Sequence, residues 1–198
     1  KTKVGTNIAD DIARVKAIRE AVGDDVKIRL DANQGWHARE AVELLKRLNE
    51  YDIELVEQPV KAHDLEGLKY VTENSYVPVL ADESVFSPED AVKIMQMRAA
   101  DLVNIKLMKC GGLYNALKIV SAAEVYGVEC MLGCMLEPKI SVNAALLPKS
   151  IWTVRCSAAK TRLSAVQYLM RKILPYPMNR DLASRELNRA RFSICKPT

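Results

Sequence analysis

Short apolar runs alternate with longer amphipathic segments along the first 148 residues of the chain. The strand-like runs cover residues 2–5, 26–33, 53–59, 77–84, 101–107 and 128–136. Apolar residues at helical spacing fill the intervals between and after these runs, at residues 8–21, 38–50, 64–74, 88–99, 113–126 and 139–147. Strands that alternate with helices of this length predict βαβ units, and therefore a parallel sheet.

A charged side chain stands at the carboxyl end of each of five successive strands. These residues follow one another at intervals of 28, 26, 25 and 24 positions, in the order Lys3, Asp31, Glu57, Asp82 and Lys106. In a (β/α)8 barrel the carboxyl ends of all strands meet at one mouth, where such enzymes keep their catalytic residues. Two lysines and three carboxylates at one mouth indicate a divalent metal ion flanked by two groups that transfer protons.

Side-chain alternation predicts which residues of these strands point into the barrel. One face of residues 26–31 is apolar and the other is charged, in the order Val26, Lys27, Ile28, Arg29, Leu30 and Asp31. We expect the apolar face to pack on the helices, which leaves the charged face inside the barrel. A charge in a barrel interior is costly to bury without a partner, so Lys27 and Arg29 are predicted to form structural ion pairs there.

The chain is long enough for one domain but short for a complete barrel. It has 198 residues, whereas a whole (β/α)8 barrel usually needs roughly 250. The predicted fold is therefore a partial (β/α) barrel of the α/β class, with about six parallel strands and with helices outside. The sequence contains no apolar run of about 18 residues and no secretion leader, so the cytoplasm is the expected location.

Cysteines and histidines give no sign of a metal site of their own. The five cysteines are odd in number and lack the paired CxxC spacing of zinc sites, and no disulfide framework is indicated. Cys130 and Cys134 flank an apolar run and are predicted to be buried free thiols. His37 and His63 each follow a strand end and are predicted to be solvated loop or helix-cap residues.

Charge divides the chain near residue 148. Residues 1–148 carry 18 lysines and arginines against 23 acidic residues, whereas residues 149–198 carry 11 against two. This basic tail contains none of the eight glycines. Its charges are scattered and are not clustered with aromatic residues, so nucleic-acid binding is the less favoured interpretation.

Five motifs resemble those of the enolase superfamily, in its muconate-lactonizing-type subgroup. The resemblance extends from Lys1 to about Ala145, and the motifs are KTKVG, LDANQGW, VEQP, ADES and NIKLMKCGG, in this order. Within the subgroup, DANQGW, NIKLMK and GCMLE are most similar to the dipeptide epimerases of the L-Ala-D/L-Glu type. Muconate cycloisomerases, N-acylamino acid racemases and o-succinylbenzoate synthases remain alternatives, since they use the same metal and lysines.

The resemblance implies a role for each charged strand end. Asp31, Glu57 and Asp82 match the Mg²⁺ ligands of the family, and oxygen ligands suit this hard cation. Lys3 and Lys106 match its two acid/base catalysts, which address opposite faces of the substrate α-carbon. One lysine would remove the α-proton to form a metal-stabilised enediolate, and the other would return a proton to the opposite face. The implied substrate is a small carboxylate molecule, in particular a dipeptide.

Other residues receive lesser roles. Lys1, the first lysine of the KxK pair, would help to lower the pKa of Lys3, because the base must be neutral and an ordinary lysine has a pKa near ~10.4. Cys134 and Leu136, which belong to the GCMLE motif, are predicted to bind the substrate. Lys109 is interpreted as an ordinary surface lysine.

Three parts of the family pattern are not found in this sequence. The chain begins at what would be the second barrel strand, without the capping domain and the first strand, and no DxD motif of an eighth strand follows Glu137. We therefore divide the chain into a barrel core at residues 1–148 and a basic tail at residues 149–198. The tail is interpreted as frame-shifted, or alternatively as a diverged segment with a helix at residues 162–174.

An incomplete barrel would have functional consequences. Uncovered sheet edges favour association between copies of the chain. The expected partners are therefore a small-molecule substrate and a second copy of the chain in a homo-oligomer. The alternative to an active enzyme is a non-catalytic barrel fragment, or a basic interaction module, that keeps the site only by descent.

Overall fold

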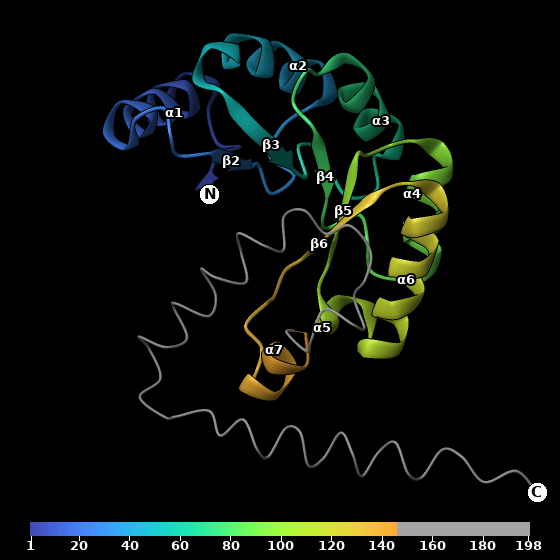
Figure 1. Cartoon of the computed structure of the whole chain (residues 1–198). Helices are drawn as coiled ribbons and strands as arrows, with labels where there is room; N and C mark the ends of the chain where they lie inside the picture. Colours follow the sequence, from blue (N-terminus) through green and yellow to red (C-terminus); the bar gives the residue numbers. More distant parts are fainter. Residues whose placement is uncertain (146–198) are drawn as a thin grey trace, which may run out of the picture. The chain divides into compact units, whose positions relative to one another are not determined.

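The six strand-like runs form one parallel sheet in the computed structural model, which describes residues 1–145. The strands pair in their order along the chain, so β1 and β6 are the two edges of the described sheet (Figure 1). The strand bounds are β1 Thr2–Lys3, β2 Ile28–Asp31, β3 Ile53–Glu57, β4 Val79–Ala81, β5 Leu102–Ile105 and β6 Glu129–Leu132. The predicted fold, a partial (β/α) barrel of the α/β class, is confirmed.

The helices α1, α2, α3, α4 and α6 cover the outer side of the sheet, whereas α7 lies beside the short helix α5, Leu107–Cys110 (Figure 1). Their bounds are α1 Ile8–Val22, α2 Ala38–Arg47, α3 Leu65–Asn74, α4 Pro88–Met97, α6 Leu113–Tyr126 and α7 Lys139–Ala145. Side-chain caps begin three of these helices, because Asn7, Asp64 and Ser87 accept hydrogen bonds from backbone N–H groups of the first turn. All six helices begin within two residues of the positions that the apolar periodicity predicts.

All six strands are shorter than the strand-like runs that predict them, as β5 and β6 illustrate. The run at residues 101–107 leaves the sheet after Ile105, and Leu107–Cys110 forms a single helical turn, α5, that ends at the left-handed Gly111. The run at residues 128–136 leaves the sheet after Leu132. A continuous apolar run predicts burial but cannot distinguish a strand from one turn of helix, so these boundaries were misplaced.

One predicted helix is interrupted. The segment at residues 38–50 is helical to Arg47, and a 3₁₀ turn, η1, follows at Asn49–Tyr51. Asp52 then adopts a left-handed conformation with φ of 45°. This turn directs the chain back into β3.

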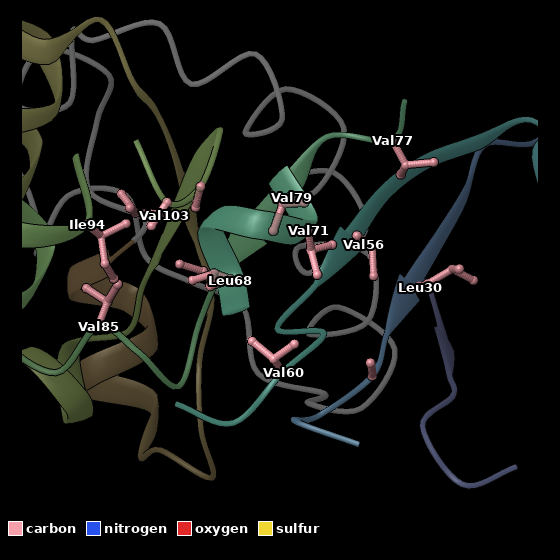
Figure 2. Close-up of a cluster of buried hydrophobic side chains, with 14 of the residues drawn as sticks. Leu30, Val56, Val60, Leu68, Val71, Val77, Val79, Val85, Ile94 and Val103 are labelled. Atoms are coloured by element: carbon pink, nitrogen blue, oxygen red, sulfur yellow. The ribbon is translucent and has the colours of Figure 1, made fainter. Parts of the chain in front are cut away.

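The main hydrophobic core lies between the sheet and the helices (Figure 2). Strand residues in this core pack with residues of α3 and α4, and the set includes Leu30, Val56, Val79, Val103, Leu68, Val71 and Ile94. Ile28 and Leu30 face this core, as alternation predicts. Val26 does not, because it precedes the first residue of β2 and is 48% exposed. A smaller cluster on the other face of the sheet joins Leu55, Leu80 and Met131.

The two charged residues early in the second strand-like run differ in their environment. Arg29 is 11% exposed and pairs with Glu54, with Nη2 lying 3.1 Å from Oε1. The structural ion pair predicted for Arg29 is confirmed. Lys27 also has a partner, since its Nζ lies 3.0 Å from Asp52 Oδ2, but both side chains are more than half exposed. The interior location predicted for Lys27 is therefore wrong, because this residue lies before β2 begins.

Thiols and imidazoles follow the prediction with one exception. Cys130 is buried, whereas Cys134 is exposed because β6 has ended before it. His37 and His63 are both exposed, and His37 stands at the N-cap position of α2.

Among residues 1–145, none of the helices combines the length and the apolar character that a membrane span needs. The predictions for the basic tail lie outside the described residues.

Candidate active site

Three acids stand at the carboxyl ends of neighbouring strands. Asp31 and Glu57 are the last residues of β2 and β3 and are paired in register, and Asp82 directly follows β4. Their exposures are 1%, 0% and 1%, so all three carboxyl groups are buried. The parallel sheet brings the three predicted metal ligands into one row, although they are far apart in the sequence.

Lys3 of β1 and Lys1 just before this strand hold the first two acids. Lys1 Nζ lies 2.6 Å from Asp31 Oδ2 and 2.5 Å from Glu57 Oε2, so one ammonium group bridges two carboxylates. Lys3 is the register partner of Asp31, and its Nζ lies 2.7 Å from Asp31 Oδ2. Both lysines of the KxK pair therefore lie at the row of acids.

Lys106 holds the third acid. It follows β5, and its Nζ lies 2.5 Å from Asp82 Oδ2. Three strands, β2, β3 and β4, separate the strand of Lys3 from the strand that precedes Lys106. The two predicted acid/base lysines thus contact the two outer acids, Asp31 and Asp82, and lie at opposite ends of the row.

A fourth lysine belongs to the same cluster. Lys109 Nζ lies 2.6 Å from Asp82 Oδ1 and also donates to the Asp82 carbonyl oxygen, and the side chain is only 4% exposed. The interpretation of Lys109 as a surface lysine is therefore wrong. The short helix α5 is the reason, because one turn brings a residue three positions after Lys106 back to the same side. The missed sequence signal was the pair of lysines at i and i+3.

A buried glutamine fixes the backbone around Asp82. Gln58 Oε1 accepts hydrogen bonds from the backbone N–H groups of Asp82 and Ser84, at 2.9 and 3.1 Å. Its Nε2 donates to the Val60 carbonyl oxygen and to Ser84 Oγ. Gln58 is fully buried, and its amide makes four hydrogen bonds. It therefore ties the end of β3 to the loop after β4.

A buried asparagine performs a similar task for Glu57. Asn104 Nδ2 donates to Glu57 Oε1 at 3.0 Å, and Asn104 is 1% exposed. Its Oδ1 is buried and has no hydrogen-bond partner among residues 1–145. Gly133 leaves room for this side chain, since a Cβ on Gly133 would lie 2.7 Å from Asn104 Oδ1 and 3.1 Å from Lys106 Cε.

The loop after β2 also contacts the cluster. Asn33 Oδ1 accepts a hydrogen bond from Lys3 Nζ, and Asn33 Nδ2 donates to Glu83 Oε1 at 2.9 Å. Three residues just beyond the strand ends have positive φ without being glycine, at 44° for Asn33, 67° for Gln34 and 40° for Gln58. Such conformations cost energy and are enriched at functional sites.

Burial and charge shift the pKa values of the three acids in different directions. Burial raises the pKa of Glu57, the charges of Asp31 and Asp82 raise it further, and Lys1 does not reverse the shift. Burial would also raise the pKa of Asp31, but hydrogen bonds from Lys1 and Lys3 outweigh it and the pKa is lowered. For Asp82, burial is outweighed by the two lysines that follow β5, and the pKa is lowered. The central acid is therefore the one that most lacks positive charge.

The pKa values of two lysines respond in opposite ways. Burial would lower the pKa of Lys1, but the charge of Glu57 and hydrogen bonds to Asp31 and Glu57 outweigh it, so the pKa is raised. Burial lowers the pKa of Lys109, and Asp82 does not fully restore it because Lys106 adds repulsion. Lys1 is thus held as an ammonium group by two carboxylates.

The three acids have the donor atoms that a divalent metal ion needs, although their side chains are not arranged around one. Within residues 1–145, no three His, Cys, Asp or Glu side chains are arranged to enclose a metal, and ammonium groups lie against the carboxylate oxygens. The chemistry of the donors nevertheless fits a hard divalent cation, because three buried carboxylates supply only oxygen ligands. Burial is the main reason that the pKa of Glu57 is raised, and the charges of Asp31 and Asp82 add to it.

The two predicted substrate-binding residues lie after β6. Cys134 and Leu136 are both exposed, and Leu136 is the most exposed large apolar side chain among residues 1–145. This segment begins next to the cluster, because the Gly133 N–H donates to the Ile105 carbonyl oxygen at 2.8 Å. Their role in substrate binding stays a prediction.

The chain belongs to the family described as "Enolase C-terminal domain-like", whose sequence profile matches residues 1–187. Among its relatives, the L-Ala-D/L-Glu epimerase of Clostridium acetobutylicum is 63% identical over 148 residues, which are 74% of this chain and 41% of that protein. The N-succinyl-L-Arg/Lys racemase of Bacillus cereus is 41% identical over 145 residues, 73% of this chain and 39% of that protein.

A solved structure agrees with these similarities. The dipeptide epimerase from Enterococcus faecalis V583, complexed with Mg and the dipeptide L-Leu-L-Tyr, matches with a TM-score of 0.71 and 56% identity. The match covers 72% of this chain and 41% of that chain. The resemblance to the enolase superfamily and to dipeptide epimerases is thereby confirmed. The chain spans about two-fifths of the length of these relatives.

Proposed function

We propose that this chain supplies the metal-binding and proton-transfer residues of an epimerase or racemase that acts on a carboxylate substrate, in particular a dipeptide. The observation that carries the proposal is the row of three buried carboxylates with Lys3 and Lys106 at its two ends. Two opposed amines beside one cation site are the arrangement that removal of an α-proton and its return to the other face require.

Asp31, Glu57 and Asp82 are the residues that would hold Mg²⁺. When bound, the cation would offset the negative charge that develops on the substrate carboxylate as the α-proton leaves. The relative from Enterococcus faecalis was crystallised with Mg and a dipeptide, which supports this choice of cofactor. Lys1 is assigned a supporting role, because it already bridges Asp31 and Glu57 and keeps the two carboxylates together.

Lys3 and Lys106 would exchange protons with the substrate at their Nζ atoms. Each Nζ is held by a carboxylate, Asp31 or Asp82, so its position is defined before the substrate binds. One of the two must be neutral to accept the α-proton while the other is charged and donates. For the reverse epimer the roles are exchanged, which makes the reaction an epimerisation.

A second candidate substrate class is an N-succinyl amino acid. The racemase of Bacillus cereus, with 41% identity to this chain, favours it. Such a substrate would need the same acids and lysines and would differ only in the groups that contact its remaining atoms. Cys134 and Leu136 are proposed for those contacts, since both are exposed just beyond β6. Self-association through the edges β1 and β6 is proposed as well.

Deuterium exchange tests the proposed function. The chain is incubated with Mg²⁺ in D₂O with L-Ala-L-Glu, with L-Ala-D-Glu, or with N-succinyl-L-arginine, and loss of the α-proton signal is followed by NMR. We expect exchange that depends on Mg²⁺. Lys3→Ala and Lys106→Ala should each lower exchange from one epimer of the dipeptide by about 10²–10⁴-fold while sparing the other epimer, because each lysine addresses one face.

Lys118→Ala is the matched control. Lys118 is exposed and lies over the Tyr114 ring on α6, so its removal should leave exchange unchanged. If Lys3→Ala or Lys106→Ala exchanged both epimers at the rate of the unaltered chain, the assignment of that lysine would be contradicted. If the unaltered chain exchanges no substrate at any Mg²⁺ concentration, the non-catalytic alternative holds instead.

A further inference from the structure

Each of the three acids divides its two oxygens between different kinds of partner. One oxygen faces the lysines with proposed roles in the reaction, and these oxygens are Asp31 Oδ2, Glu57 Oε2 and Asp82 Oδ2. The other oxygen accepts a hydrogen bond from a group outside that set. These donors are the backbone N–H of Asn33 at 3.1 Å, Asn104 Nδ2 at 3.0 Å and Lys109 Nζ at 2.6 Å.

Two of these three anchoring groups are neutral, and the third is charged. The N–H of Asn33 and the amide of Asn104 orient their carboxylates without changing the local charge. Lys109 orients Asp82 and also places a buried positive charge beside it. Asp82 is thus held between two ammonium groups, one on each oxygen.

We propose that Lys109 is a positioning residue that holds Asp82 Oδ1 and leaves only Oδ2 for a bound divalent cation and for Lys106. The inference rests on the proposed function, because it assigns Asp82 to the cation site. Lys109 also offsets part of the negative charge of Asp82, so the acid is a weaker cation ligand than it would be alone.

The surroundings of Lys109 make it a rigid anchor. Its Nζ has three N–H donors, and it contacts Asp82 Oδ1, the Asp82 carbonyl oxygen and, at 3.4 Å, the Asn104 carbonyl oxygen. The Phe86 ring centroid lies 5.4 Å from Nζ, a distance at which a cation and an aromatic face attract. The backbone of Lys109 is fixed by its N–H, which donates to the Lys106 carbonyl oxygen at 3.0 Å.

The first test measures the coupling between Lys109 and Asp82 without any metal. Unfolding by urea in the presence of a chelator is compared for the unaltered chain, Lys109→Met, Asp82→Asn and the double variant. We expect the effect of the double variant on the unfolding equilibrium constant to differ about tenfold from the product of the single effects. Single effects that simply multiply would overturn the inference, whatever the outcome for the proposed function.

The second test measures Mn²⁺ binding by electron paramagnetic resonance, with Mn²⁺ as a probe for the Mg²⁺ site. Removing a buried charge close to Asp82 should strengthen binding, so Lys109→Met is expected to lower the Mn²⁺ dissociation constant by about tenfold. Lys109→Arg keeps the charge and should stay close to the unaltered chain. Circular dichroism spectra confirm that each variant is folded.

Lys118→Met is the matched control, since Lys118 also lies over an aromatic ring, 4.5 Å from the Tyr114 centroid, but is exposed. It should leave Mn²⁺ binding unchanged. If Lys109→Met binds Mn²⁺ as tightly as the unaltered chain or more weakly, then Lys109 does not offset the negative charge of Asp82. If instead Asp82→Asn binds Mn²⁺ as well as the unaltered chain, the proposed metal site fails, while coupling in the first test still establishes Lys109 as the anchor of Asp82.

Discussion

Gly133 is the position where the smallest change should disturb the active-site cluster most. A Cβ at this position would lie 2.7 Å from Asn104 Oδ1, 3.1 Å from Asn104 Nδ2 and 3.1 Å from Lys106 Cε. The first distance is far below ordinary van der Waals contact. Asn104 has no room to retreat, because it is 1% exposed and donates to Glu57. Gly133 is held as well, since its N–H donates to the Ile105 carbonyl oxygen.

The magnitude follows from these contacts. Forcing an extra methyl group into a packed site costs about 1–3 kcal/mol. Displacing Asn104 breaks its hydrogen bond to the Glu57 carboxylate, and a hydrogen bond to a carboxylate contributes about 1.5–3 kcal/mol. Alanine in place of glycine restricts the unfolded chain, and this effect stabilises the folded state by about 0.4–1 kcal/mol. Gly133→Ala should therefore lower the free energy of unfolding by about 2–5 kcal/mol.

Urea denaturation of four proteins tests this reasoning: the unaltered chain, Gly133→Ala, Asn104→Ala and the double variant. Asn104→Ala removes the side chain that the new methyl group would strike. Gly133→Ala should therefore cost at least about 1 kcal/mol less in the Asn104→Ala background than in the unaltered chain. Equal costs in both backgrounds, or a cost of Gly133→Ala below about 0.5 kcal/mol, would refute the proposed clash.

Two further predictions concern other parts of the fold. Burial and the nearby Asp52 carboxylate raise the pKa of Tyr76 to about 12 from its ordinary value of 10.0, so its neutral form is favoured in the folded chain. The stability that this raised pKa contributes is present below pH 10 and is lost as the pH rises through 12. Ultraviolet titration should show a late step of tyrosinate formation that Tyr76→Phe removes. If Tyr76→Phe titrates like the unaltered chain, the shift is contradicted. Gln58→Ala would leave the N–H groups of Asp82 and Ser84 without their acceptor, so the free energy of unfolding measured with urea should fall by about 2–4 kcal/mol. A loss below about 1 kcal/mol would show that Gln58 does not stabilise the loop after β4.

Much of the fold could be predicted because strands and helices have different periods. A parallel sheet with helices outside follows from runs of apolar residues that alternate with segments of helical spacing. The row of Lys3, Asp31, Glu57, Asp82 and Lys106 followed from the same pattern. In a parallel sheet each strand enters from the same side, so residues at strand ends meet even when they are about 25 positions apart.

The boundaries were less predictable, since they depend on which backbone hydrogen bonds form. Leu107 continues an apolar run, yet it begins a helical turn because Gly111 closes that turn in a left-handed conformation. The same apolar side chain can be buried from either backbone geometry. Cys134 was expected inside for a similar reason and is outside because the sheet ends at Leu132.

The sequence by itself determined the class of the fold, the order of the strands and the five charged residues at the strand ends, because all of these follow from local period and spacing. Only the tertiary structure revealed the groups that orient the acids. Asn104 lies in β5, Lys109 lies after β5, and Gln58 lies after β3. The residues next to them in the sequence do not show which carboxylate or backbone group each side chain contacts. A hydrogen bond between distant residues depends on the packing of whole strands and helices, so the positions of these side chains were decided only when the chain folded.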